Sequence, residues 1–392
     1  MDAMVELDSP PAFALGDEHR AVAEMARGFA DERIAPHALE WDETRHFPLD
    51  VMREAAALGM AAISVPEEQG GAGLDRLAQA VIFEQLATGC PTVAAFLSIH
   101  NMVTYLVARE GTDAQRAAWL PQLVAMEAVA AYCLTEPGSG SDAAALRTRA
   151  VRDGDDYVLD GAKQFISGGG EADLYLVMCR TEEHKTRGIS AILVPGDAPG
   201  LSFGRNERKM GWNAQPTRQL VFEGCRVPAG NLLAGEGQGF RIAMQGLDGG
   251  RINIAACSLG GAQSAFERAR DYAAERQVFG RPVSAHQAPA FQLADMATEI
   301  EAGRLMLYAA AARMDERAAD AGVWSAMAKR LVSDRCHAVA DQALQLHGGY
   351  GYLHEYGVEK IVRDLRVHRI LEGTNDIMRL VIARHVTGGA AR

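Results

Sequence analysis

Glu372 is the residue whose type and setting best suit acid–base chemistry. It stands in ILEGTNDIMR at 370–379, on a loop just before a helical pattern, where a carboxylate can accept a proton. Gly373 lets the backbone approach a ligand because it has no Cβ, and the Thr374 hydroxyl can cap the start of a helix. The same residues also fit an ordinary helix cap with a solvated glutamate, so this segment alone leaves both interpretations open.

Two segments rich in glycine and serine could line a ligand. In YCLTEPGSGSDAAAL at 132–146, small residues expose successive N–H groups that can bind an anion or the edge of a heteroaromatic ring. In KQFISGGGEADLYLV at 163–177, Phe165 stands near the hydroxyl of Ser167 and could cover a planar ring system. A hairpin turn and a buried strand end are the alternatives. The first segment has neither a P-loop lysine nor a Rossmann strand–helix unit around it.

Two further segments carry cations. ERQVFGRPVSAHQ at 275–287 places Arg276 near Phe279 between two long helical patterns, and a cation beside an aromatic ring suits a pyrophosphate and an adenine. A solvated loop between helices has the same composition. In LDGGRINIA at 247–255, Arg251 is either a substrate-binding cation or a charge on a helix surface.

Composition narrows the class of protein. A chain of 392 residues with 48% hydrophobic and 23% charged residues is typical of a globular protein of two or three domains. Its net charge of −12 argues against nucleic acid or an anionic membrane as a partner. Six scattered cysteines indicate reduced thiols, and no spacing suggests a metal site. MDAMVELDSPPAF lacks a targeting pattern and no run of about 18 apolar residues is evident, so we expect a cytoplasmic protein.

The elements that must position these residues follow the order helix, strand, helix. We expect domains at 1–129 (helical), 130–238 (β) and 239–392 (a helix bundle). Asp17 is the expected N-cap of the first helix, and the dipeptides Asp153-Gly154 and Asp160-Gly161 predict hairpins in a small antiparallel domain. The C-terminal helices are expected at 240–275, 288–316, 320–346, 358–369 and 374–387.

Taken together, the motifs YCLTEPGSGSD, RQVFG, LHGGYGY and LEGTNDI, in this order, resemble those of the acyl-CoA dehydrogenase family over essentially the whole chain. The resemblance implies an α+β multidomain fold with an N-terminal all-α domain, a middle antiparallel β-barrel-like domain and a C-terminal four-helix bundle. It also implies a homotetramer that binds FAD between the β and C-terminal domains.

The resemblance assigns roles residue by residue. The implied FAD-binding residues are Tyr132, Leu134, Thr135, Gly140, Ser141, Phe165, Ile166, Ser167, Arg276, Phe279, His286, Gln287, Gln345, Leu346, Gly348, Gly349, Thr374, Asn375 and Asp376. The implied substrate-binding residues are Ser141, Asp248, Arg251 and Gly373. Several of the FAD contacts are expected across a subunit boundary.

The implied reaction is α,β-dehydrogenation of an acyl-CoA. Glu372 would remove the α-proton, with a pKa raised by burial, while its backbone N–H and a ribityl hydroxyl of FAD hold the thioester oxygen. Flavin N5 would accept the β-hydride, and the electrons would pass to an electron-transfer flavoprotein. The resemblance implies no metal, nucleic-acid or membrane partner.

One departure indicates a branch of the family. Phe165-Ile166-Ser167 replaces the commoner Trp-Ile-Thr, and together with VRDLRVHRILEGTNDIMR it looks most like the isobutyryl-CoA dehydrogenase branch of valine breakdown. Butyryl- and 2-methylbutyryl-CoA are alternative substrates, because one methylene is worth only about 1–3 kcal/mol of discrimination. Two alternatives come from other functional classes. One is a flavin-dependent oxidase or monooxygenase, and the other is a non-enzymatic flavoprotein that acts in nucleic-acid binding or assembly.

Overall fold

The computed structural model describes residues 15–388, so the N-terminal stretch used above to judge targeting lies outside it. The helices that precede the sheet are α1 (Asp17–Phe29), α2 (Ala38–Thr44), α3 (Leu49–Ala57), α4 (Arg76–Gly89), α5 (Pro91–Glu110) and α6 (Asp113–Val124). A π-helix (Ala30–Ile34) and a 3-10 turn (Ala35–His37) join α1 to α2.

The ends of these helices follow local chemistry. The expectation that Asp17 caps α1 was wrong: Gly16 is the N-cap and Asp17 is the first residue of the helix. At that position the Asp17 carboxylate is stabilised by the positive end of the helix dipole. Asp75 caps α4 by accepting from the Ala78 N–H. Thr112 caps α6 in a capping box.

The middle of the chain forms one eight-stranded sheet in the order β6-β7-β3-β2-β4-β5-β8, with β1 paired to β4. The strands are β1 (Ala130–Cys133), β2 (Arg149–Asp153), β3 (Asp156–Ser167), β4 (Leu174–Arg180), β5 (Ile189–Pro195), β6 (Leu201–Phe203), β7 (Thr217–Pro228) and β8 (Leu232–Leu233). Most strand pairs in this sheet are antiparallel, as predicted, but β1 runs parallel to β4, as does the single β2–β4 pairing, so the sheet is mixed. The β2–β3 segment supplies the long crossover that a parallel pair requires.

The two Asp-Gly dipeptides have different structures. Asp153-Gly154 does form the turn between β2 and β3, where Asp153 pairs with Asp156. Asp160-Gly161 lies instead inside β3, at a register shift against β7. A Cβ on Gly161 would lie 2.7 Å from the Thr148 Cα, so glycine here permits a bulge and a close backbone approach rather than a hairpin.

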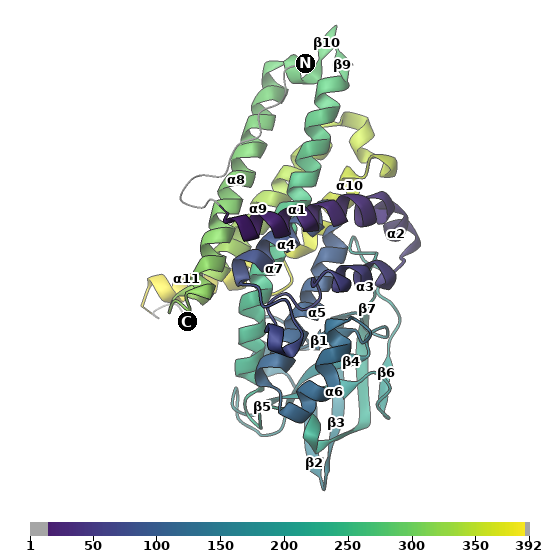
Figure 1. The fold of residues 1–392 in the computed structure, drawn as a ribbon, viewed down its shortest axis with the longest axis vertical. Helices are drawn as coiled ribbons and strands as arrows, with labels where there is room; N and C mark the ends of the chain where they lie inside the picture. Colours follow the sequence, from purple (N-terminus) through teal and green to yellow (C-terminus); the bar gives the residue numbers. More distant parts are fainter. Residues whose placement is uncertain (1–14, 389–392) are drawn as a thin grey trace.

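The C-terminal region contains the helices α7 (Gly239–Glu275), α8 (Gln287–Asp315), α9 (Ala321–Leu346), α10 (Val358–His368) and α11 (Asn375–Val386). The predicted helices are confirmed to within about two residues at each end. A short hairpin of β9 (Gln277–Val278) and β10 (Arg281–Pro282) joins α7 to α8. In Figure 1, α7 runs from the β domain to this hairpin at the opposite end of the molecule. Its 37 residues span about 55 Å.

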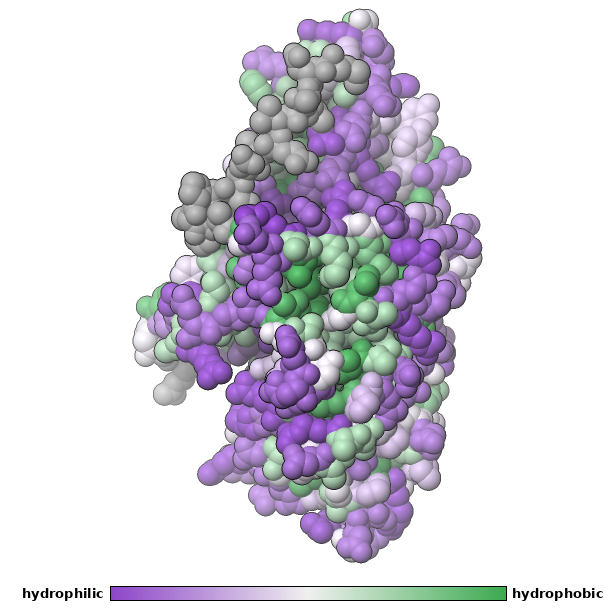
Figure 2. All heavy atoms as spheres, viewed as in Figure 1, coloured by the Kyte–Doolittle hydropathy of each residue, from purple (hydrophilic) through white to green (hydrophobic). Residues whose placement is uncertain are grey.

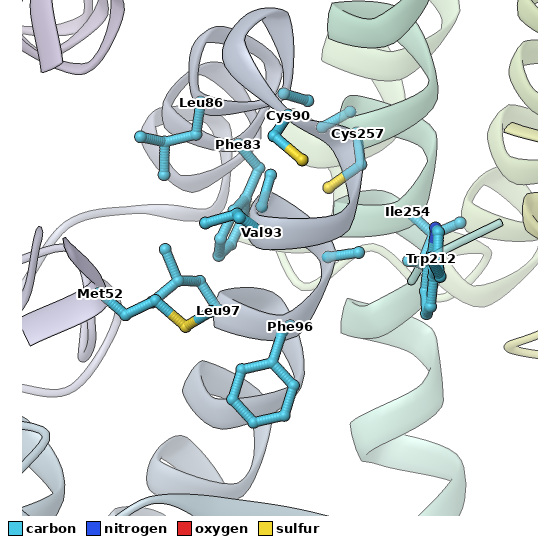
Figure 3. Packing of buried hydrophobic residues seen from close by; sticks show 14 of the residues in the cluster. Met52, Phe83, Leu86, Cys90, Val93, Phe96, Leu97, Trp212, Ile254 and Cys257 are labelled. Atoms are coloured by element: carbon cyan, nitrogen blue, oxygen red, sulfur yellow. The ribbon is translucent and has the colours of Figure 1, made fainter. Parts of the chain in front are cut away.

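Helices from both halves of the chain share one core. Figure 3 shows four of the core side chains facing one another. They are Phe83 in α4, Cys90 at the C-terminal end of α4, Val93 in α5 and Cys257 in α7. All six cysteines are buried free thiols, as expected from their scattered positions. Hydrophilic residues cover most of the face in Figure 2, and apolar side chains gather near its middle.

Within residues 15–388, helix α5 is the one helix that is long and apolar enough to cross a membrane, by length and composition alone. An 18-residue window of its 20 residues, Pro91–Glu110, has a mean hydropathy of 1.3. However, 89% of the apolar window is buried inside the protein, which is the environment of a core helix.

Candidate active site

Glu372 lies on the tight loop between α10 and α11. Its φ is +56° and that of Gly373 is +90°, so two successive residues adopt the left-handed conformation that glycine tolerates and glutamate rarely adopts. Thr374 then caps α11 by accepting from the Ile377 N–H at 3.2 Å, which confirms the predicted cap. A non-glycine residue held in this conformation is typical of a functional site.

The Glu372 carboxylate packs against α7 at Gly250. A Cβ on Gly250 would lie 2.6 Å from Glu372 Oε2 and 3.1 Å from Oε1, so only glycine leaves room for the carboxylate. Oε2 is buried and has no hydrogen-bond partner among the described residues. A buried, unpaired carboxylate oxygen is costly in an apolar setting, and it is therefore available to a ligand.

Burial raises the pKa of Glu372 to about 7, and the nearby cations Arg251 and Lys329 oppose this rise. Tyr132 of β1 also faces this region, because the Glu372 charge and, above all, burial raise the pKa of its phenol. A carboxylate with a pKa near neutrality can take a proton at physiological pH and release it again. The site can therefore perform proton abstraction.

Two buried cations hold the backbone around Glu372. Arg251 Nε donates to the carbonyl oxygen of Glu372 at 3.3 Å, and its Nη1 donates to Asp248 at 2.6 Å. Lys329 Nζ donates to the carbonyl oxygen of Gly373 at 2.8 Å. Of the implied substrate-binding residues, Asp248, Arg251 and Gly373 thus lie together beside Glu372, while Ser141 is an exposed loop residue.

The other two residues of the α11 start have different surroundings. The Asn375 amide is buried against α9, where it accepts from Lys329 Nζ at 2.9 Å and donates to Ser333 and Asp334. Asp376 is exposed and pairs with Arg379 at 3.0 Å.

The loop after β1 has a rigid base and an open tip. Lys163 Nζ, fully buried, donates to the Leu134 carbonyl at 3.1 Å and to Glu136 at 2.7 Å. Thr135 accepts at its carbonyl from the Gln164 N–H at 2.8 Å. A Cβ on Gly140 would meet nothing within 4 Å. The backbone here is accessible to a large planar group or an anion.

The end of β3 presents a ring to the surface. Phe165 has a φ of +59° and is 65% exposed, whereas Ile166 is buried in the core beneath it. The Ser167 hydroxyl accepts from Gln215 Nε2 at 3.2 Å. An exposed aromatic ring in a strained conformation beside a hydroxyl fits the face of a flavin.

The remaining implied cofactor residues lie at the far end of α7. Phe279 is 97% exposed at the tip of the hairpin, His286 contacts the Val278 carbonyl at 3.0 Å, and Arg276 lies 5.4 Å from the centre of the Tyr350 ring. Gln287 begins α8, Gln345 and Leu346 end α9, and Gly348 and Gly349 follow in a 3-10 turn. Figure 1 shows this group separated from the β domain by the length of α7, so one chain does not bring the two groups together.

Sequence reasoning missed three residues of this site. Gly250 makes room for the carboxylate, and Lys163 and Lys329 are buried cations that hold backbone carbonyls. Lys329 carried a usable signal: it follows Ala326 by three residues and precedes Ser333 by four, on the buried stripe of α9. A lysine on a buried stripe needs a partner, and its partner is the Glu372 loop.

The chain matches three family models in order. These are the acyl-CoA dehydrogenase N-terminal domain at residues 16–127, the middle domain at 131–225 and the C-terminal domain at 237–387. Isobutyryl-CoA dehydrogenase, mitochondrial, of Dictyostelium discoideum is 54% identical over 96% of this chain and 91% of its own length.

Two solved structures superpose on nearly the whole chain. Butyryl-CoA dehydrogenase from Megasphaera elsdenii gives a TM-score of 0.92 at 37% identity, covering 95% of this chain and 99% of that one. A chain from work on the electron transferring flavoprotein of Acidaminococcus fermentans gives 0.93 at 39% identity, covering 95% and 99%. With all three domains matched in order and a glutamate whose Oε2 is buried on the loop before the last helix, the chain belongs to the acyl-CoA dehydrogenase family.

Proposed function

We propose that this protein dehydrogenates a short branched-chain acyl-CoA, with isobutyryl-CoA as its preferred substrate and Glu372 as the base. The observation that carries the proposal is the buried Glu372 Oε2, which has no partner among the described residues. The 54% identity to an isobutyryl-CoA dehydrogenase supports the branched substrate. The conversion of isobutyryl-CoA to methacrylyl-CoA would place the enzyme in valine catabolism.

Glu372 acts on the α-proton of the thioester. Because burial raises its pKa to about 7, the carboxylate is basic enough to compete for a weakly acidic C–H and is still ionised in a large fraction of molecules at neutral pH. We assign its backbone N–H to the thioester oxygen, where negative charge develops as the proton leaves. Arg251 fixes this backbone through the Glu372 carbonyl rather than by pairing with the carboxylate.

FAD is the cofactor, and when bound it supplies the acceptor for the β-hydride. The open backbone around Gly140 and the exposed Phe165 ring would hold its isoalloxazine. The hairpin with Arg276 and Phe279 would hold the pyrophosphate and adenine of an FAD in a neighbouring subunit. This division supports a homotetramer, because the two halves of the site lie at opposite ends of one chain.

We assign an electron-transfer flavoprotein as the electron acceptor. The likeness to a chain studied with such a protein in Acidaminococcus fermentans supports this assignment. An oxidase on the same scaffold would instead consume oxygen in the presence of substrate and no other acceptor.

Anaerobic titration of the purified yellow protein tests the proposal. Isobutyryl-CoA should decolourise the flavin most completely among butyryl-, isobutyryl-, 2-methylbutyryl- and isovaleryl-CoA. Glu372→Gln should keep FAD and the visible spectrum but lose bleaching, because the amide cannot accept the proton. Absence of bleaching by every acyl-CoA in the panel would exclude dehydrogenation, and full bleaching in Glu372→Gln would exclude Glu372 as the base.

A further inference from the structure

Lys329 is a buried cation whose side-chain hydrogen bonds, among the described residues, go to the start of α11. Its side chain is fully buried, and Nζ donates to the Gly373 carbonyl at 2.8 Å and to Asn375 Oδ1 at 2.9 Å. No carboxylate lies within ion-pair distance of it among the described residues. Burying a lysine without a paired carboxylate is expensive, so its neutral partners and a more distant anion must compensate.

The segment that Lys329 holds is strained. Glu372 and Gly373 are successive left-handed residues, and such a conformation persists only where the surroundings fix it. Arg251 of α7 holds the first carbonyl and Lys329 of α9 holds the second. The loop is therefore clamped between two helices by two cations, and the direction of the Glu372 side chain depends on both.

We propose that Lys329 is a positioning residue for the proton-abstracting step. Its ammonium group fixes the Gly373 carbonyl and thereby the orientation of the Glu372 side chain. The same group supplies the positive charge that favours the ionised carboxylate. The inference rests on the proposed function, since it assigns Glu372 as the base. Lys329 itself does not touch the reacting atoms.

Several other groups face the pair. Arg251 and Asp248 approach from α7, Tyr132 from β1, Asp334 from α9 and His368 from α10. Arg251 is already neutralised by Asp248 at 2.6 Å, and Asp334 is paired with Arg369 at 2.7 Å. Lys329 is thus the cation near Glu372 without a carboxylate of its own among the described residues, and burial lowers its pKa to about 7 while Glu372 opposes that change.

The test compares Lys329→Met with Arg330→Met. Both remove one positive charge from adjacent positions of α9, but the Arg330 side chain is partly exposed and, within residues 15–388, its ionic partner is Asp334, at 3.9 Å. In Lys329→Met, kcat for isobutyryl-CoA should fall about 10²-fold, since a displacement of about 1 Å has that effect, while KM changes little. The acid limb of kcat should move up by about one pH unit, as expected when an opposite charge is removed. FAD content should be retained.

A second measurement does not depend on turnover. The Glu372 carboxylate can be titrated by carbon-13 NMR in glutamate-labelled protein, with the signal assigned by its loss in Glu372→Gln. Its midpoint should rise in Lys329→Met and stay unchanged in Arg330→Met. An unchanged midpoint in Lys329→Met, or an equal shift in both variants, would overturn the role of Lys329. A wild-type protein that no acyl-CoA bleaches would overturn the proposed function and the catalytic part of the Lys329 role, but not the effect of Lys329 on the Glu372 midpoint.

Lys329→Arg covers the case in which the methionine variant does not fold. It keeps the positive charge and the donor, so the Glu372 midpoint should stay near that of the wild type even if kcat falls. If the Glu372 midpoint rises by about one pH unit in Lys329→Arg, as expected for loss of the charge, the proposal is contradicted.

Discussion

At the scale of the residue, the site depends on what is missing beside Glu372 as much as on what is present. Gly250 has no side chain where the carboxylate lies, and the described residues offer Oε2 no hydrogen bond. The result is a carboxylate, the proposed base, that is dehydrated but still interacts electrostatically with two nearby cations. Its strength is set by burial first and by those charges second.

The pH dependence of the reaction follows from this balance. The base must be ionised to act, so kcat/KM should rise with pH and level off above a midpoint near the Glu372 pKa of about 7. Below that pH the carboxylate is protonated and the rate should fall about tenfold per pH unit. Initial rates with isobutyryl-CoA from pH 5.5 to 9 measure the profile. A rate that stays flat down to pH 5.5 contradicts a raised pKa.

Gly250→Ala should displace the carboxylate. The new Cβ would lie 2.6 Å from Oε2, so Glu372 must move and kcat should drop about 10²-fold. The neighbouring Gly249→Ala is a matched control, because its Cβ would meet the flexible end of Arg76 at 3.1 Å, which can shift. Both changes add helix propensity to α7. Equal activities of the two variants would show that the fit at Gly250 is unimportant.

The residue scale also shows what the sequence can predict. The cap at Thr374 and the glycine at 373 depend only on neighbouring residues in the sequence, so both could be predicted. The structure confirms the cap. Lys329 lies 43 residues before Glu372 in the chain, so its hydrogen bond to Gly373 exists only after α9 and the loop pack together. Gly250 is similar, because a Gly-Gly pair in a helix does not reveal which side chain fills the space.

At the scale of the element, β3 shows how one local signal can have two structures. Asp-Gly dipeptides favour left-handed backbone, which serves a hairpin at Gly154 and a bulge at Gly161. Only the pairing of β3 with β7 decides between them. The start of α11 was easier to predict, since Thr374 acts within one turn of its own helix.

Substitutions at these two glycines should separate backbone strain from steric overlap. Both have positive φ, but a Cβ on Gly154 would meet nothing within 4 Å and one on Gly161 would lie 2.7 Å from the Thr148 Cα. Gly154→Ala should cost about 1–2 kcal/mol of unfolding free energy. Gly161→Ala should cost a further 1–3 kcal/mol, roughly, because the neighbouring backbone must move. Urea denaturation of both variants provides the comparison, and equal losses would argue against the steric term.

At the scale of the whole molecule, the proposed cofactor contacts lie in two separate places on the chain. The β domain carries Phe165, and the hairpin with Phe279 lies beyond the other end of α7. The proposed shared site would give the 97% exposed Phe279 ring a contact outside its own chain. The sequence predicted both segments and the long helix between them, but the direction of α7, from the β domain to the hairpin, comes from the structure.

Phe279→Ala should therefore weaken FAD binding without weakening the fold. An exposed ring contributes little to the stability of its own chain, so the thermal midpoint of the apoprotein should remain. FAD retained after gel filtration should fall, and so should the fraction of tetramer measured by light scattering. Phe291→Ala, at a residue on α8 that is 60% exposed, is the control. Full FAD occupancy in Phe279→Ala would argue against a shared site.

The enclosed thiols described with the core have a practical consequence. Since each of the six cysteines is buried, the native thiols should not react with maleimide reagents in the folded protein. An added surface cysteine could therefore be labelled selectively. A single cysteine placed next to the hairpin tip, at Gly280, would carry a spin probe. Distances between such probes would then test whether copies of the chain assemble as the proposed homotetramer requires.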